Sequence, residues 1–339
     1  MVDIELKHTE RESWIDNLRG FGILLVILGH ISYSEGYIQN AIYSFHMPLF
    51  FFISGYLLSK YDNCVLSFKF FFNKILSLLW PYCTYSIIAF LYLAIVRNFP
   101  ELKYAIKQTV FLQGYGNLWF IPCLLLAELL GILFLKFSFK IQAIIILLLM
   151  ILTSVVSVYV IPLCNYKNIG VLLIFINRIL ISIVFLFCGK LFSISNKNLK
   201  NGKLRLILFI GAMLFFTLNM VLCQINGIVD LHMARMNNPF YYWFFSISSI
   251  FCLGFIFSFI KIKLIPLNIY GKLSLSIMCL TSYLPFYFYG NLLSKAIFGD
   301  NMNILNLLFT WLFTVIFSGC ISYFIKRFMT FINVFPWKK

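Results

Sequence analysis

Long apolar runs follow one another along almost the whole 339-residue chain, and they limit the fold more than any other feature. A membrane-spanning helix needs about 20 mostly apolar residues. None of the runs shows the alternation of a membrane β-barrel strand. We therefore expect an all-α polytopic membrane protein, a bundle of about ten transmembrane helices forming a single domain over 1–339. The predicted spans are 18–34, 41–59, 74–96, 118–135, 141–161, 169–189, 204–224, 240–260, 268–290 and 303–325.

The composition supports a membrane protein and indicates how its helices pack. Hydrophobic residues make up 62% of the chain and charged residues 11%, whereas soluble domains have about 45–50% and about 25%. Phe occurs 40 times and Gly only 18 times. We therefore expect bulky, aromatic helix contacts rather than close contacts between small residues.

The positions of Lys and Arg predict the orientation of the chain in the membrane. If the N-terminal segment 1–17 is cytoplasmic, the cytoplasmic side holds most of the 27 basic residues, as the positive-inside rule requires. We expect both termini, including the short tail after residue 325, to be cytoplasmic. No small-x-small cleavage site follows the first apolar run, so we expect the first span to be retained rather than removed as a signal peptide. The opposite side holds only Arg97, Lys103, Lys107, Lys167, Arg178, Arg235 and Lys295.

The basic residues and the cysteines each argue against one kind of ligand. The net charge of +16 is scattered between the spans and forms no arginine-rich face, so we expect no nucleic acid partner. The nine cysteines are dispersed and form no CxxC pair, so we expect no metal site and no bound cofactor.

Two histidines in neighbouring spans are the strongest candidates for chemistry. His30 lies toward the outer end of the first span and His46 near the outer start of the second, where Pro48 fits the first turn of a helix. Both rings should therefore face the external half of the membrane. His30 suits a general base, or is a core histidine bonded to a backbone carbonyl. His46 either contacts the acceptor or is a solvated interfacial ring.

Several charged residues could assist these rings. Glu35 either orients His30, as in a catalytic triad, or is an ordinary loop charge. Asp16 and Arg19 either pair with each other on one helix face, or Arg19 contacts a phosphate-bearing donor. Lys74, at the cytoplasmic start of the third span, is either a phosphate contact or a positive-inside anchor.

Two ionisable residues lie deep in apolar spans. Glu128 and Arg178 should both face the interior of the bundle and need partners there, but the sequence does not say whether they pair with each other. Trp119 and Phe120, followed by Pro122, form a rigid aromatic entry to the fourth span or belong to an interfacial belt.

Two long segments resemble the membrane-bound acyltransferase-3 family: Trp14–His30, reading WIDNLRGFGILLVILGH, and Ser44–Tyr56, reading SFHMPLFFFISGY. The resemblance is greatest to its fucose 4-O-acetylase-like branch, which acetylates sugars of bacterial surface polysaccharides. It covers nearly the whole chain, with shorter matches at Trp80–Tyr82, Leu118–Pro122 and Gly271–Ile277.

The resemblance implies a ten-span bundle that moves an acetyl group from acetyl-CoA to a sugar hydroxyl. It assigns an essential role to His30 and places Asp16 and Arg19 at the positions of the family's Asp and Arg. Two positions depart from the family. Ser77 stands where many members have the second Arg of an Arg-x-x-Arg pair that begins here with Lys74, and Thr281 stands where many have a histidine.

Together these features predict a membrane-bound sugar O-acetyltransferase of the bacterial inner membrane. Acetyl-CoA would dock from the cytoplasm near Arg19 and Lys74, with Trp119 and Arg178 as further substrate contacts and His30 as base or relay. The acceptor would be a lipid-linked or surface glycan in contact with membrane lipid. The alternatives are a transporter or flippase for such a glycan with His30 as a proton relay, or an inactive subunit of an export complex.

Overall fold

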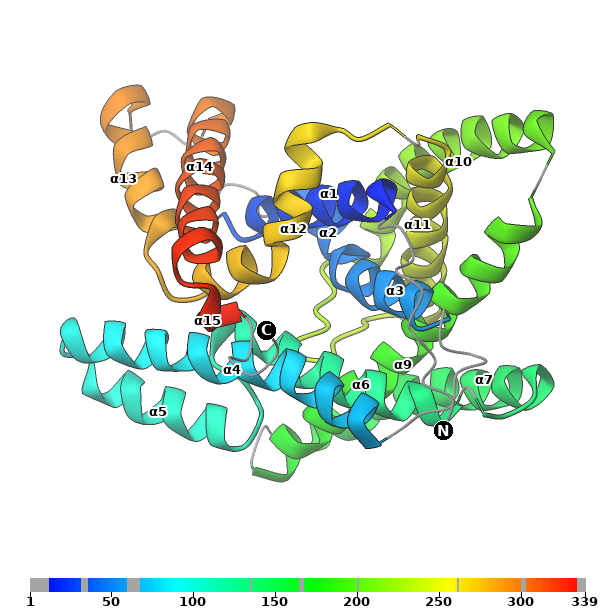
Figure 1. Cartoon of the computed structure of the whole chain (residues 1–339), viewed down its shortest axis with the longest axis horizontal. Helices are drawn as coiled ribbons and strands as arrows, with labels where there is room; N and C mark the ends of the chain where they lie inside the picture. The colour runs from blue at the N-terminus through cyan, green and yellow to red at the C-terminus, as the bar shows by residue number, and fades with distance from the viewer. Residues whose placement is uncertain are drawn as a thin grey trace.

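The computed structural model describes residues 12–31, 36–59, 68–134, 136–164, 168–199, 201–260, 262–299 and 303–333, and these are helical with no strand (Figure 1). The all-α expectation is therefore confirmed for these residues. The helices are α1 (Ser13–Gly29), α2 (Tyr37–Tyr43), α3 (His46–Leu58), α4 (Phe68–Ile95), α5 (Phe99–Val110), α6 (Phe120–Phe134), α7 (Phe139–Val155), α8 (Ile161–Leu163), α9 (Asn168–Asn198), α10 (Gly202–Leu222), α11 (Pro239–Phe259), α12 (Ile265–Leu280), α13 (Phe286–Phe298), α14 (Ile304–Phe328) and α15 (Thr330–Asn333).

Eight helical stretches within the described ranges are long and apolar enough to cross a membrane. They correspond to eight of the ten predicted spans. The other two predicted spans differ: α1 has only 17 residues, and the run 268–290 is divided between α12 and α13. The count of ten stays a prediction. So does the cytoplasmic placement of the termini, because 1–11 and 334–339 lie outside the described residues.

Prolines explain where the apolar runs are interrupted. A proline inside a helix clashes with the carbonyl four residues earlier and has no N–H to donate. Pro48 disfavours a regular helix through Ser44, and the chain breaks at 44–45 between α2 and α3, although α4 continues through Pro81. Pro285 has the same relation to Thr281, and the chain breaks at 281–285 between α12 and α13. His46 is the first residue of α3, so its predicted place at a helix entrance is confirmed.

Glycines form the closest helix contacts, contrary to our expectation from composition. A Cβ at Gly20 of α1 would overlap the Leu267 carbonyl, and one at Gly271 of α12 would overlap the Asp16 carbonyl. Gly55 of α3 and Gly189 of α9 have the same reciprocal relation. The prediction was wrong because the number of glycines says nothing about where they lie. Four well-placed glycines are enough to bring two helix pairs into backbone contact.

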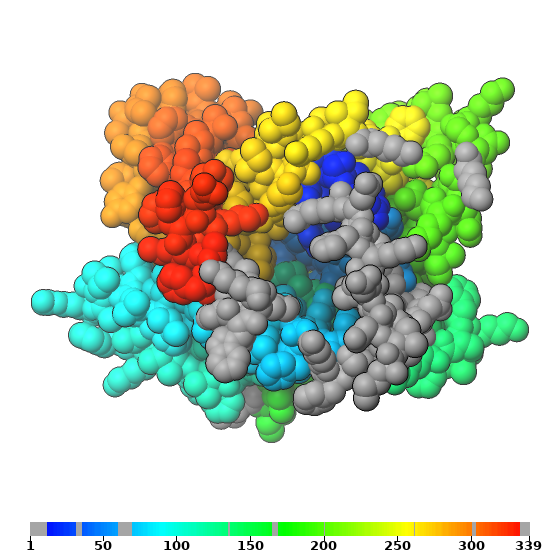
Figure 2. Space-filling view, viewed as in Figure 1, coloured from blue at the N-terminus to red at the C-terminus, as the bar shows by residue number. Residues whose placement is uncertain are grey.

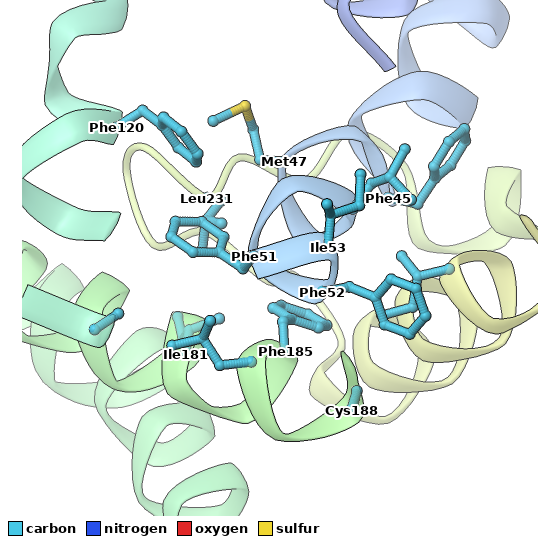
Figure 3. Close-up of a cluster of buried hydrophobic side chains, with 14 of the residues drawn as sticks. Phe45, Met47, Phe51, Phe52, Ile53, Phe120, Ile181, Phe185, Cys188 and Leu231 are labelled. Atoms are coloured by element: carbon cyan, nitrogen blue, oxygen red, sulfur yellow. The ribbon is translucent and has the colours of Figure 1, made fainter. Parts of the chain in front are cut away.

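A large apolar core surrounds α3, where phenylalanines pack against α6 and α9 (Figure 3). Phe51 and Phe52 are completely buried, as is Phe185 of α9. Leu231, from the segment between α10 and α11, lies in the same cluster near Phe51. The core therefore holds that connecting segment against the bundle.

The C-terminal helices lie above α4 and α5 in both overall views (Figures 1 and 2), and α15 packs against α4. Trp80 Nε1 donates to the Phe331 carbonyl at 2.6 Å, and the Thr84 hydroxyl donates to the Ile332 carbonyl at 2.7 Å. These bonds close the bundle by joining its last helix, α15, to α4.

Candidate active site

A cavity of about 530 Å³ lies beside the N-terminal half of α1. Asp16 and Arg19 line it from α1 and Lys74 from α4, so the structure brings together three residues predicted to bind substrate. Its charged lining also includes Lys272 of α12 and two further acids, Glu12 and Glu128. Acidic and basic side chains are therefore present in equal number, three of each.

Lys74 and Glu128 form an ion pair in this cavity. The Lys74 ammonium lies 2.9 Å from a Glu128 carboxylate oxygen, and the Ser54 hydroxyl donates to the other oxygen of that carboxylate. The sequence left open whether Glu128 pairs with Arg178, and the structure gives it Lys74 instead. Lys74 keeps 25% of its side-chain surface exposed, whereas Glu128 keeps 4%. The cation can therefore still reach a bound anion.

A second cavity, of about 140 Å³, lies at the other end of α1 and contains both candidate histidines. His30 opens onto it just beyond α1 and His46 at the start of α3. The Tyr43 ring lies between them, 6.1 Å from the His30 ring and 4.8 Å from the His46 ring, centre to centre. The sequence placed these two imidazoles on one side of the membrane, and the fold puts them in one cavity.

The hydrogen bonds of the two rings determine which nitrogens can react. His46 Nδ1 lies 2.9 Å from the Ile42 carbonyl oxygen, which can only accept. Nδ1 of His46 therefore carries the proton, and Nε2 of the neutral ring keeps its lone pair. His30 Nδ1 lies 3.3 Å from the Tyr43 hydroxyl, which can donate or accept. His46 is buried at 5% exposure, so it is not the solvated interfacial ring of one alternative.

The segment 227–238, between α10 and α11, supplies two polar residues that the sequence analysis missed. Asp230 and His232 both line the smaller cavity. The backbones of Asp230 and Arg235 are paired by bonds of 2.9 and 2.7 Å, and an Asp230 oxygen accepts the His232 N–H at 2.8 Å. The buried side chains of this segment are Val229, Leu231, Ala234 and Met236. The sequence did offer a signal for this segment: His232 is one of only four histidines and lies among alternating apolar residues.

Arg178 and Trp119 both contact this segment at His232. The Trp119 ring stacks on the His232 ring at 5.3 Å, and the Arg178 guanidinium lies 5.3 Å from the Trp119 ring centre. Arg178 also donates to Gln113 Oε1 at 2.6 Å and to the His232 carbonyl at 3.4 Å. Trp119 lines the smaller cavity, but Arg178 is not among the residues that line either cavity.

Burial changes the ionisation of the segment's two polar residues. It lowers the pKa of His232 to about 4, with a further contribution from the positive charge of Arg178. Burial also raises the pKa of Asp230, although the backbone N–H of His232 and Arg178 act in the opposite direction. The His232 ring is therefore neutral at pH 7 and can exchange hydrogen bonds with a neutral ligand.

Both cavities are lined by residues of α1, α3 and α12, and by α6 together with the 3₁₀ turn Gly116–Trp119 that precedes it. The residues run from the larger to the smaller cavity in the order Asp16, Arg19, Val26 and His30 on or just after α1; Ser54, Phe50, Met47 and His46 on α3; Glu128, Leu124 and Phe120 on α6, then Trp119 in the turn before it; and Gly271, Ser274, Leu275 and Met278 on α12. The two cavities are therefore neighbours along the same helices. Glu35 lies outside the described residues, so its role beside His30 stays a prediction.

Comparison with known proteins identifies the family. The acyltransferase-domain model of the acyltransferase-3 family matches residues 12–323, which is nearly the whole chain. The chain therefore belongs to that family of membrane acyltransferases. No curated protein and no solved structure matches it, so this family model and the geometry above are the basis for assigning a function.

Proposed function

We propose that this member of the family transfers an acetyl group from acetyl-CoA to a sugar hydroxyl of a lipid-linked or surface glycan, in a bacterial inner membrane. One observation carries the proposal. The small cavity that holds His30 and His46 shares a lining residue, Met278, with a larger cavity whose lining includes Arg19, Lys74 and Lys272. The larger cavity suits an anionic donor, and the smaller one holds groups that can accept a proton.

The donor has phosphates for the basic residues of the larger cavity and an arm long enough to reach the smaller one. Its phosphates would contact the side chains of Arg19 and Lys74, since Lys and Arg are the usual phosphate ligands. Arg19 and His30 are eleven positions apart on or at the end of α1, which is about 16 Å at 1.5 Å per residue. The extended pantetheine arm would cover that distance and present its thioester in the smaller cavity.

The reaction needs a base at the hydroxyl and an acid at the departing sulfur. His30 would take the hydroxyl proton at Nε2 while its Nδ1–H donates to the Tyr43 oxygen, 3.3 Å away. The sugar oxygen then bonds to the carbonyl carbon of the thioester, the C–S bond breaks, and the imidazolium returns its proton to the thiolate. Such general base catalysis is worth about 10²–10⁴-fold in rate.

The acceptor would be held by the polar groups on the far side of the same cavity. His46 Nε2 can accept a hydrogen bond from a sugar hydroxyl, because its Nδ1 is committed to the Ile42 carbonyl. The Asp230 carboxylate and the His232 ring face the cavity from the 227–238 segment. Hydroxyl-rich ligands are bound by such mixed donor and acceptor sets.

The test compares surface polysaccharide from cells with the intact gene, a deletion, and His30→Ala or His30→Gln. Proton NMR should show O-acetyl signals only with the intact chain, at equal levels of membrane-inserted protein. Purified protein should also consume acetyl-CoA and release free CoA in the presence of membrane extract. If acetylation persists in the deletion while the amount of surface polysaccharide falls, the transporter alternative replaces this proposal.

A further inference from the structure

Met278 is the one residue, among those the structure describes, that lines both cavities. It lies on α12 and is 3% exposed. Gly271, Leu275 and Met278 share one face of that helix, and the larger cavity extends along this face for seven residues, or about 10 Å. The side chain of Met278 therefore stands where the larger cavity ends and the smaller one begins.

Two phenylalanines complete the boundary from the opposite helices. Phe50 of α3 and Phe120 of α6 line the larger cavity, and their ring centres lie 5.9 Å apart in an edge-to-face arrangement. Their neighbours along each helix, Met47 and Trp119, line the smaller cavity. Phe50, Phe120 and Met278 thus lie at the boundary between the two cavities, and we call this boundary the neck.

We propose that Met278 sets the upper size limit of the acyl group that this enzyme transfers. The inference rests on the proposed function: the acyl group at the tip of the pantetheine arm must fit in the smaller cavity, and Met278 forms part of the wall of that cavity. This cavity is about 140 Å³ and must also admit part of the acceptor. Each methylene that a tight site must reject changes the specificity by about 10–200-fold.

Methionine is suited to this position because its side chain is long, unbranched and apolar. It fills the neck without a charge or a hydrogen-bonding group that would hold the thioester. Replacing it with Ala removes the thioether arm and opens the neck from the α12 side. Replacing it with Leu keeps a side chain of similar volume, so the neck should stay narrow.

The experiment is a competition between equimolar acetyl-CoA and butyryl-CoA, each with a different isotope in the acyl group. Membrane vesicles from deletion cells that express one variant supply the enzyme and the native acceptor. The measured quantity is the ratio of the two labels in the glycan fraction. Because both donors compete for the same enzyme molecules, this ratio does not depend on how much of a variant is folded.

Wild type and Met278→Leu should favour acetyl strongly, and Met278→Ala should shift the ratio toward butyryl by about 10-fold or more. Leu273→Ala is the matched control, since Leu273 is equally buried on α12 but lines neither cavity. An unchanged ratio in Met278→Ala, or an equal shift in Leu273→Ala, overturns the inference and leaves the proposed function intact. If wild type transfers neither label while its vesicles retain acceptor, both fail.

Discussion

Substituting Gly271 by Ala tests whether backbone contact between α1 and α12 holds the walls of the two cavities together. In a helix interior Ala is favoured over Gly by about 1 kcal/mol. At Gly271, however, the new Cβ would overlap the Asp16 carbonyl oxygen. Overpacking costs about 1–3 kcal/mol, and the upper value applies because a backbone carbonyl cannot rotate away. We therefore expect a net loss of about 2 kcal/mol, despite the gain in helix propensity.

Gly211 provides the control, because it also lies inside a helix but has open space around its Cα. Gly211→Ala should stabilise the protein by about 1 kcal/mol through helix propensity alone. In a thermal unfolding assay in detergent, Gly271→Ala should unfold roughly 4–8 °C below wild type and Gly211→Ala slightly above it. Gly271→Ala should also lower activity, since α1 and α12 both line the larger cavity. If Gly271→Ala unfolds at or above the wild-type temperature, the close crossing is wrong.

Two further predictions concern the charged residues. Glu128→Gln removes the anion beside Lys74 but can still accept from Ser54. CoA should therefore bind about 2–5-fold more tightly, as expected for a partly exposed pair, whereas Lys74→Gln should weaken the binding. Calorimetry that shows no change in either variant would contradict this. Burial of the His232 ring predicts a pH-dependent opening of the 227–238 segment. The pKa of His232 is lowered to about 4 when the segment is packed, against about 6.5 when it is locally unfolded. Between these two pH values the unfolded segment therefore binds more protons than the packed one. Amide hydrogen exchange in 227–238, corrected for intrinsic rates, should therefore accelerate as pH falls from 6.5 to 4. His232→Gln should remove that acceleration. Asp230, whose pKa is raised by burial, would then slow the exchange as pH falls.

Local patterns were sufficient for one part of the site. The first two apolar segments carry Asp16, Arg19, His30 and His46 in a recognisable order, and a continuous helix places the first three along one line. Residues on one face of a helix recur every three or four positions. The sequence therefore predicted that the cations lie at one end of α1 and the imidazoles at the other, as the structure has them.

The remainder of the site depends on contacts between distant segments. Glu128 meets Lys74 across 54 positions, and Asp230 and His232 reach the histidine cavity from nearly 200 positions away. No periodicity in the sequence predicts such contacts between distant residues. The helix breaks near Ser44 and Thr281 could be predicted from the sequence only in part. The apolar run continues through each break, and only a proline four residues later indicates it.

The sequence by itself determined that the chain is a bundle of apolar helices, because hydropathy and helix period are properties of neighbouring residues. It also singled out the first helix as the one with the most candidate site residues, Asp16, Arg19 and His30. The tertiary structure alone decided which polar groups share a cavity, and that Met278 stands between two cavities. Those outcomes follow from how closely and at what angle helices cross. Here that closeness is set by Gly20 and Gly271 meeting backbone carbonyls on opposite helices, a contact that forms only when the whole bundle is packed.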